Sequence, residues 1–430
     1  MKGFITMLIF HVDVNSAFLS WSALKKLSEE PGSIDLRTIP SAVGGDVSTR
    51  HGIITAKSIP AKKYDIQTGE PVVSALRKCP SLLLVPADFA AYRHYSRSFI
   101  HLLSGYTDRL EQISIDEAFL DMSSSKNSDP IALAMKIKAE VKNELGFTVN
   151  IGISTNKLLA KMASDFEKPD RVHTLYPSEI REKMWPLPIG DLYGCGSASS
   201  KRLSSAGILT IGDAAAASET YLQDLLGDKA GSYIYKSANG IGSDQVKPGR
   251  DAAKSYSNEL TTSFDIVKEN YEKEMLPLLK QLAKKLSSRL QKDQIYAFTI
   301  GIQVKTSSFR RKSRQMRLPA STNDSKQIYS AAKALADQLL CAPGGLFEEG
   351  CGVRLIGIFV SHLDDRKVHQ MNLDELLQRR QADLEKEKKK KEEEEKKEKL
   401  RLMTQQIRSR FGDDAILPGI HTNSEPEKHK

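Results

Sequence analysis

Cysteine is scarce in the 430-residue chain, and its four copies, Cys79, Cys195, Cys341 and Cys351, form no CxxC pair. The sequence therefore suggests neither a zinc site nor a disulfide framework, and free thiols in a reducing compartment are the simple interpretation. No apolar stretch approaches the roughly 20 residues that a membrane helix needs, and the apolar run before Asp13 is too short for a secretory signal. We expect a soluble, intracellular protein.

A large excess of one charge is also missing. Lys and Arg total 63 against 54 Asp and Glu, which gives +9. This excess fits a polyanionic partner but does not by itself indicate nucleic-acid binding. The all-charged block 385–399 holds seven Glu and eight Lys, so it does not create the excess. We interpret it as a solvated helix or a disordered spacer.

Strand and helix patterns alternate along a chain that is too long for one hydrophobic core, so several domains are expected. Short apolar runs predict strands and helical spacing predicts helices. The strands are expected at 7–14, 82–86, around 111–122 and at 147–154, and the helices at 18–29, 91–105 and 130–145. A small helical region should occupy 170–240, and 255–361 follows the order strand, helix, strand, strand, helix, strand. The pattern predicts a multidomain α+β fold whose last part is of the split-βαβ kind.

Acidic residues stand at the ends of expected strands. Asp13 ends the first apolar run, Asp116 and Glu117 are adjacent, and Asp121 follows. Mg²⁺ prefers carboxylate oxygens, and two such ions can clamp the attacking and leaving oxygens of a displacement. Neighbouring strand residues point to opposite faces, so Asp116 and Glu117 share a site only if the backbone turns there. Taken alone, the acids favour a plainer interpretation, a capping residue and an exposed turn.

The residues around these acids resemble a known family. FHVDVNSAF (10–18), SIDEAFLDM (114–122) and NIGISTNKLLAKMASDFEKPD (150–170) are similar, in order and spacing, to the three palm motifs of the DinB/UmuC family of Y-family DNA polymerases. The resemblance implies an α+β right-hand polymerase. The implied parts are a palm (1–20 and 78–168), fingers (21–77), a helix-hairpin-helix thumb (169–240), a split-βαβ little finger (250–362) and a charged tail (363–430).

The resemblance also assigns roles around the acids. It implies that Asp13, Asp116 and Glu117 hold two Mg²⁺ ions, which Mn²⁺ can replace, with the main-chain carbonyl of Val14 as a further ligand. Glu117 is the residue marked as catalytic. Phe18 matches the aromatic gate that excludes a ribose 2′-OH, whereas its sequence pattern alone predicts an ordinary core aromatic.

Several lysines match the family's contacts to the incoming triphosphate. Lys168 matches the lysine before a proline, and Lys62 falls where the family carries a phosphate-binding Arg or Lys. Lys157 and Lys161 can share one helix face, which would otherwise be a solvated basic face. The chain departs from the DinB pattern at three positions, where many members carry Tyr, Glu and Asp: Ile59, Pro60 and Asn15. These departures concern the triphosphate contacts and not the metal site.

Two later segments predict contacts with DNA. Gly194 and Gly196 precede a helix and a second helix start at 210–212, which resembles a helix-hairpin-helix whose backbone N–H groups hold a phosphate. A plain helical connection with glycine caps is the alternative. A basic cluster is expected to follow the DNA backbone or, alternatively, to protect a strand edge: Lys305, Arg310, Arg311, Lys312, Arg314 and Arg317.

The tail carries two short motifs. VHQMNLDELL (368–377) partly fits the segment with which family members dock on the bacterial sliding clamp. Gln370 and Leu373 fit, but Asp374 takes the place of the aromatic residue, and the start of an amphipathic helix is an equally good interpretation. QQIRSRFGDDAI (405–416) resembles the C-terminal segment of some DinB-type enzymes.

Together these features predict a template-directed, low-fidelity DNA polymerase for lesion bypass, which transfers a nucleotide from dNTP to a primer 3′-OH and releases pyrophosphate. Primer–template DNA, dNTP and the sliding clamp are the expected partners of a monomer at the nucleoid of a bacterial cytoplasm. One alternative is a catalytically silent accessory relative, which would lose the three carboxylates. The other is a palm-domain nucleotide cyclase, which leaves the hairpin segment and the basic segment unexplained.

Overall fold

The computed structural model describes residues 7–45, 52–125, 129–249, 252–365 and 373–412. The chain divides into two compact units, one made of residues 1–253 with the short segment 261–263 and the other made of the rest. The predicted α+β class is confirmed by three separate sheets flanked by helices. Within the described ranges, no helix is both long and apolar enough to cross a membrane.

A five-stranded sheet carries the acidic residues. Its order is β5-β6-β1-β7-β8, so β1 is central, and it runs antiparallel to both neighbours. The strands are β1 (Ile9–Val14), β5 (Leu110–Gln112), β6 (Glu117–Asp121), β7 (Val149–Ser154) and β8 (Val172–Thr174). The first four confirm the predicted strands, whereas the sequence pattern does not indicate β8.

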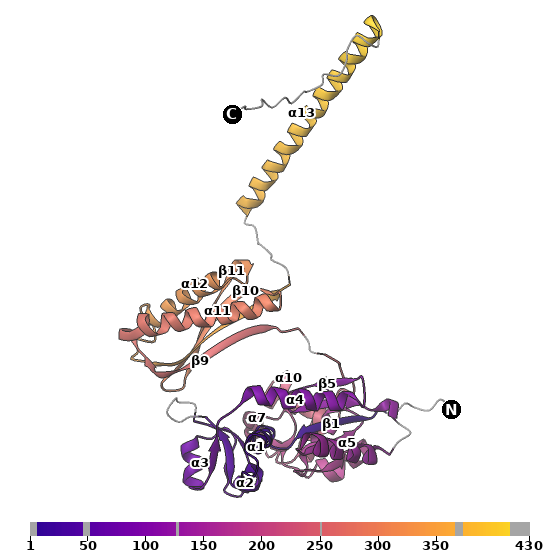
Figure 1. Ribbon diagram of the computed structural model, residues 1–430, viewed down its shortest axis with the longest axis vertical. Helices are drawn as coiled ribbons and strands as arrows, with labels where there is room; N and C mark the ends of the chain where they lie inside the picture. Colours follow the sequence, from indigo (N-terminus) through magenta and orange to yellow (C-terminus); the bar gives the residue numbers. More distant parts are fainter. Residues whose placement is uncertain (1–6, 46–51, 126–128, 250–251, 366–372, 413–430) are drawn as a thin grey trace, which may run out of the picture. The chain divides into compact units, whose positions relative to one another are not determined.

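One face of this sheet is apolar. Phe10, Val12 and Val14 alternate along β1 and are buried, because every second strand residue projects to the same face. Three helices supply the side chains that cover them: α1 (Ala17–Glu29), α4 (Phe89–Ser104) and α5 (Pro130–Leu145). Helices α4 and α5 can be followed beside β1 in Figure 1. Burial of each such side chain contributes roughly 1.5–3 kcal/mol, so this core holds β1 in place.

The opposite face of β1 carries His11 and Asp13, and α6 (Lys157–Asp165) packs near it. Gly152 on β7 allows this close packing. A Cβ atom at Gly152 would lie 2.0 Å from the carbonyl oxygen of Ala160 and 2.4 Å from the backbone nitrogen of Ser164. The missing side chain therefore lets α6 approach the sheet at the level of the acidic residues.

A second, three-stranded sheet has the order β3-β2-β4. It consists of β2 (Ser41–Gly44), β3 (Ile54–Lys57) and β4 (Leu83–Val85), with η1 (Leu36–Thr38), α2 (Ile59–Lys62) and α3 (Val72–Lys78) beside it. Strand β4 pairs in parallel with β2, although the boundary predicted between fingers and palm is at 77–78. The sheet therefore extends past that boundary, because β4 comes after the predicted end of the fingers.

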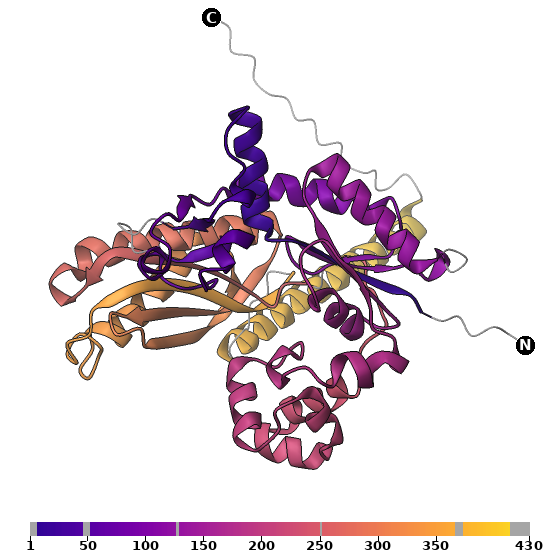
Figure 2. The same ribbon diagram turned by 90° about the horizontal axis from the view of Figure 1, so that it is seen from below.

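The region 170–240 is mainly helical, as predicted. Its short helical turns are η3 (Pro177–Glu179), η4 (Ile180–Met184) and η5 (Ile189–Asp191). Four helices follow: α7 (Ser197–Ser205), α8 (Ile211–Ala216), α9 (Glu219–Leu226) and α10 (Asp228–Ala238). Buried side chains of these elements share one hydrophobic cluster, and Figure 2 shows the segment, in pink, as one group of helices.

The second unit has the predicted order of strands and helices. The strands are β9 (Ser255–Ile266), β10 (Tyr296–Thr306), β11 (Arg311–Thr322) and β12 (Val353–Asp364), arranged β11-β10-β12-β9. The helices are α11 (Leu276–Lys292) and α12 (Ser325–Ala336), with helical turns at η6 (Lys268–Asn270), η7 (Tyr271–Met275) and η8 (Asp337–Cys341). Apolar residues of both helices and all four strands share one core. The block 385–399 lies within α13 (Leu373–Phe411), which agrees with the helical interpretation.

Gly152→Ala should destabilise the first unit, because the added Cβ would strike backbone atoms of α6 that cannot move without shifting the helix. We expect the free energy of unfolding to fall by about 3 kcal/mol, the upper end for overpacked sites, measured as the urea midpoint of the tryptophan and circular dichroism transitions. Gly196→Ala is the matched control, because a Cβ there meets no atom within 4 Å and φ is negative. Equal midpoints for the two variants would contradict this account of the packing.

Candidate active site

Asp13 and Glu117 lie directly opposite each other on neighbouring strands. They are paired in the register of β1 and β6, so both side chains project from the same face of the sheet. The Cβ atoms of such pairs are about 4.5–5.5 Å apart, and like charges there repel. The sheet thus brings together two acids that are far apart in the sequence.

Asp116 lies in a bend just before β6. Its carbonyl oxygen accepts a hydrogen bond from the Val14 amide, 3.0 Å, which fixes the bend at the end of β1. The turn needed to bring Asp116 and Glu117 to one site is therefore present. Asp121, in contrast, lies opposite Ile9 at the other end of β6 and pairs with Arg109 at 3.1 Å.

The surroundings shift the pKa values of two acids in opposite directions. Burial, with the negative charges of Asp13 and Glu117, raises the pKa of Asp116. The His11 ring, 3.2 Å from Glu117, and Lys161 beside it lower the pKa of Glu117 to about 2. Burial in turn lowers the pKa of His11 and favours a neutral imidazole. Glu117 is therefore ionised, and its negative charge is stabilised by nearby positive charge.

Two lysines supply that positive charge in this structure. Lys161 Nζ lies 2.9 Å from Oε2 of Glu117 and 3.7 Å from Oδ2 of Asp13. Lys168 pairs with Asp13 and, at 2.7 Å, with Asp165. Over the part of the chain that the structure describes, no three His, Cys, Asp or Glu side chains already surround one point as a metal cage would.

The donor set nevertheless suits divalent cations. Asp13, Asp116 and Glu117 offer hard oxygen ligands of the kind that Mg²⁺ and Mn²⁺ take. The lysine ammonium groups on Asp13 and Glu117 show that the carboxylates can be neutralised by cations from the side of α6. The residues present therefore fit the group that the family resemblance implies.

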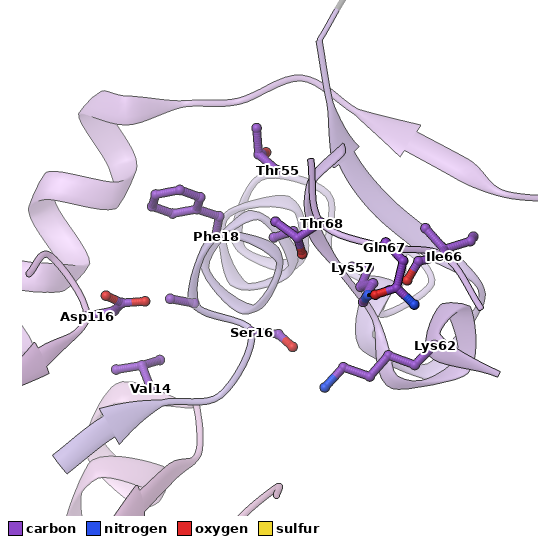
Figure 3. Close-up of a pocket in the computed structure, with 12 residues that line it drawn as sticks. Val14, Ser16, Phe18, Thr55, Lys57, Lys62, Ile66, Gln67, Thr68 and Asp116 are labelled. Carbon is purple, nitrogen blue, oxygen red and sulfur yellow. Dashed lines mark hydrogen bonds between the residues drawn. The ribbon is translucent and has the colours of Figure 1, made fainter. Parts of the chain in front are cut away.

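A pocket of about 580 Å³ opens beside the acids. Val14 and Asp116 line one side, where Phe18 also lies, and Lys62 extends from α2 toward Ser16 (Figure 3). Other lining residues come from α1, β3 and the turn after α2: Ala17, Thr55, Ala56, Lys57, Ile66, Gln67 and Thr68. The predicted residues Val14, Phe18, Lys62 and Asp116 therefore share one pocket, whereas Lys168 pairs with Asp13 and is not among its lining residues.

Phe18 is held in an aromatic cluster at the edge of this pocket. Its ring stacks on Tyr92 with a centroid distance of 4.6 Å and meets Phe89 edge-on at 6.0 Å. Ser16, at the turn from β1 to α1, has a positive φ of 47°. This tight turn sets the first turn of α1, with Phe18, beside the end of β1. The ring is thus both part of a cluster and exposed to the pocket.

Three side chains near the acids were not singled out in the sequence: His11, Ser164 and Ser114. Ser114 donates to Oδ1 of Asp116. His11 reaches Glu117 and Ser164, and its only sequence signal is a polar residue within a buried apolar run. The interpretation of Lys157 and Lys161 as a solvated face is wrong, because they pair with Glu111 at 2.8 Å and Glu117 at 2.9 Å.

Asn15, one of the departures from the DinB pattern, has a structural role here. Its side-chain nitrogen donates to Oδ1 of Asn150, 3.0 Å. Its side-chain oxygen accepts from the Thr148 hydroxyl and the Asp170 amide, both at 2.9 Å. Neighbouring segments therefore use both acceptor positions of the amide oxygen and one N–H of the amide nitrogen, and Asn15 is not among the residues that line the pocket.

The predicted DNA-contacting residues lie in two places. Gly194 has a positive φ of 85°, and a Cβ there would lie 2.5 Å from the Tyr233 ring, so only glycine fits. Gly196 is the N-cap of α7, and the second helix, α8, starts after Thr210 as expected. Most of the basic cluster lies on the edge strand β11 and the turn before it, where these side chains are exposed: Arg310, Arg311, Lys312 and Arg314.

Of the two residues predicted to contact the clamp, one lies in the part of the chain that the structure describes. Gln370 lies outside the described residues. Leu373 is the first residue of α13. The clamp segment thus stays a prediction.

Comparisons with known proteins match nearly the whole chain. The model of the impB/mucB/samB family matches residues 12–165, that of its C-terminal domain matches 253–373, and that of the DNA polymerase-iota thumb domain matches 190–242. The chain is similar to a DNA polymerase IV of Clostridium acetobutylicum, with 38% identity over 421 residues, 97% of this chain and 98% of the relative. It is also similar to DNA polymerase IV 1 of Bacillus subtilis, with 31% identity over 427 residues, 98% of this chain and 95% of the relative.

Solved structures share the fold. A Y-family DNA polymerase chimera of Dbh and Dpo4 matches with a TM-score of 0.71 and 24% identity, over 83% of this chain and 99% of that one. A Dbh ternary complex matches with a TM-score of 0.56 over the same shares. The palm motifs, the thumb model, the C-terminal model and the near full-length relatives agree. The chain therefore belongs to the impB/mucB/samB family, the DinB/UmuC group of Y-family DNA polymerases.

Proposed function

We propose that this chain is a template-directed DNA polymerase of the translesion type, which adds a dNTP to a primer 3′-OH and releases pyrophosphate. One observation carries the proposal: the register that sets Asp13 opposite Glu117 also brings Asp116 to the wall of a nucleotide-sized pocket. The near full-length similarity to relatives named DNA polymerase IV supports the same activity.

The chain's own residues would perform three tasks. Asp13, Asp116, Glu117 and the Val14 carbonyl would hold two Mg²⁺ or Mn²⁺ ions, which supply Lewis-acid stabilisation of the reacting oxygens when bound. Lys62 reaches into the pocket from α2, where its charge can attract a triphosphate. Lys168 sits on Asp13 and can exchange that carboxylate for a phosphate oxygen. Catalysis then depends on positioning and on electrostatic stabilisation.

The architecture suggests how the parts divide the work. We assign the palm to the five-stranded sheet, the fingers to the three-stranded sheet including β4, the thumb to the helices between 169 and 240, and the little finger to the sheet of β9–β12. The N–H groups after Gly194 and Gly196, and the basic cluster of β11, would hold DNA phosphates without reading sequence. Because the two named relatives come from bacteria, we expect a cytoplasmic protein. From the family resemblance we also expect a monomer, with the sliding clamp as a further partner.

Asp116→Ala should abolish primer extension, because it removes a metal ligand from the pocket wall. DNA binding should be retained, because the substitution removes no basic residue. We expect the extension rate with Mg²⁺ and dNTP to fall by about 10²–10³-fold or more. Asp108→Ala is the control, since Asp108 is an exposed acid outside the site. Extension by Asp116→Ala at the rate of that control would refute the role of Asp116 as a metal ligand, and failure of the wild-type protein to extend a primer would refute the polymerase assignment.

Phe18→Ala should raise ribonucleotide incorporation, because it removes the ring that lines the pocket beside Asp116. We expect the dNTP-over-rNTP preference to fall at least tenfold, the factor that about 1.4 kcal/mol gives, in single-nucleotide insertion assays. Phe89→Ala separates the gate from the aromatic cluster, since Phe89 contacts Phe18 but does not line the pocket. If both variants kept the wild-type preference, Phe18 would be only a core residue.

The basic cluster should bind DNA through phosphates. Arg311→Ala, Lys312→Ala and Arg314→Ala together should weaken primer–template binding, and the slope of log affinity against log salt should flatten by about 0.9 for each phosphate that is no longer neutralised. Fluorescence anisotropy at several salt concentrations measures both. The triple variant Lys280→Ala, Lys284→Ala and Lys285→Ala removes the same charge from exposed positions of α11. Identical slopes for the two triple variants would show that only net charge matters.

A further inference from the structure

The function proposed above does not use the most deeply buried titratable side chain of the site, His11. Its ring is 1% exposed and stands two residues before Asp13 on the same face of β1. Its Nδ1 lies 2.8 Å from the Ser164 hydroxyl oxygen, and its Nε2 lies 3.2 Å from Oε2 of Glu117. The Phe119 ring, 4.7 Å away at an angle of 55°, fixes the plane of the imidazole.

The hydrogen-bond partners determine which ring nitrogen carries the proton. The single Ser164 hydroxyl proton can go to the Lys161 carbonyl oxygen, 2.8 Å away, or to His11 Nδ1. Nε2 makes no hydrogen bond of regular geometry among the described residues, and Oε2 of Glu117 at 3.2 Å is the oxygen it faces, so with the proton on Nδ1 its bare lone pair would point at a carboxylate. A buried acceptor facing an anion is unfavourable. With the proton on Nε2, the N–H group faces the negatively charged oxygen of Glu117 and Nδ1 can accept from the Ser164 hydroxyl.

We propose that His11 is a positioning residue for Glu117. The Ser164 hydroxyl donates to Nδ1, and Nε2–H donates to Oε2 of Glu117, so a rigid strand-borne ring holds one carboxylate oxygen. Among the hydrogen bonds and ion pairs of the described residues, none involves the other oxygen, Oε1, which is left for a cation. This inference rests on the proposed metal-dependent function, in which Glu117 is a ligand.

The imidazole of His11, fixed on a strand, suits this task better than the lysine that shares the same oxygen. Lys161 also lies near Asp13 and Asp165, and its ammonium group would compete with a divalent cation for the carboxylates. Among the ion pairs of the described residues, His11 contacts only Glu117 of these carboxylates, so it can orient that side chain without bridging to Asp13 or Asp165. Such hydrogen bonds behind a ligand typically change metal affinity or activity by 10–100-fold when removed.

The test compares two substitutions of similar size. His11→Leu fills the space but removes the donor, and His11→Gln keeps an N–H near the Nε2 position. Calorimetric titration of the free protein with Mn²⁺ should show affinity at least about tenfold weaker for His11→Leu and within about threefold of wild type for His11→Gln. In single-nucleotide insertion, the Mg²⁺ concentration for half-maximal rate should rise in parallel, while the dissociation constant for primer–template stays unchanged.

Controls separate positioning from packing. His101→Leu makes the same change at an exposed position of α4 and should leave Mn²⁺ affinity at the wild-type value. Equal Mn²⁺ affinity for His11→Leu and wild type would overturn the proposal, even if His11→Leu lowered the melting temperature. An Nδ1–H tautomer for His11 in ¹⁵N-histidine NMR of the unmodified protein would overturn it as well. These readouts decide the role of His11 even if wild-type protein failed to extend a primer, which would refute only the polymerase assignment.

Discussion

The structure depends on one electrostatic constraint: two carboxylates, Asp13 and Glu117, are directly opposite each other on adjacent strands. Such a pair destabilises a sheet unless positive charge or hydrogen-bond donors accompany it. Their apolar neighbours leave no freedom to avoid it, because a register shift of one residue would turn Val12 and Val14 out of the core. The hydrophobic effect therefore enforces a repulsion that the site must neutralise.

The polar face of the sheet provides that neutralisation through one helix and the loop after it. Gly152 lets α6 approach the strands closely enough for Lys161 to reach Glu117 and for Ser164 to reach His11. Lys168 follows just after the helix and pairs with Asp13. When divalent cations bind, they would take over the charge that the lysines now balance, and a lysine released in this way could contact phosphate. In this view, the stability of the unliganded site and its capacity for nucleotide transfer have the same physical origin.

Much of this could be predicted from the sequence. The apolar runs predict β1 and β7, the order of elements in 255–361 predicts the split-βαβ arrangement, and the motifs single out Asp13, Asp116 and Glu117 as candidate ligands. Strand pairing could not be predicted, because the apolar pattern indicates neither that β4 joins β2 in parallel nor that Asp13 lies directly opposite Glu117. The role of His11 could not be predicted, because a single polar residue within a buried apolar strand gives the same sequence pattern as a core residue. The pairing of Lys157 and Lys161 depends on the helix approach that Gly152 allows, a tertiary effect that charge patterns do not reveal.

We propose that the carboxylates at the ends of β1 and β6 bind two divalent cations. Anomalous diffraction from crystals grown with primer–template, dNTP and Mn²⁺ tests it most directly. The account predicts two manganese peaks bounded by Asp13, Asp116 and Glu117, with Lys161 and Lys168 moved off the carboxylates. Manganese bound elsewhere, with both lysines still paired to Asp13 and Glu117, would contradict it.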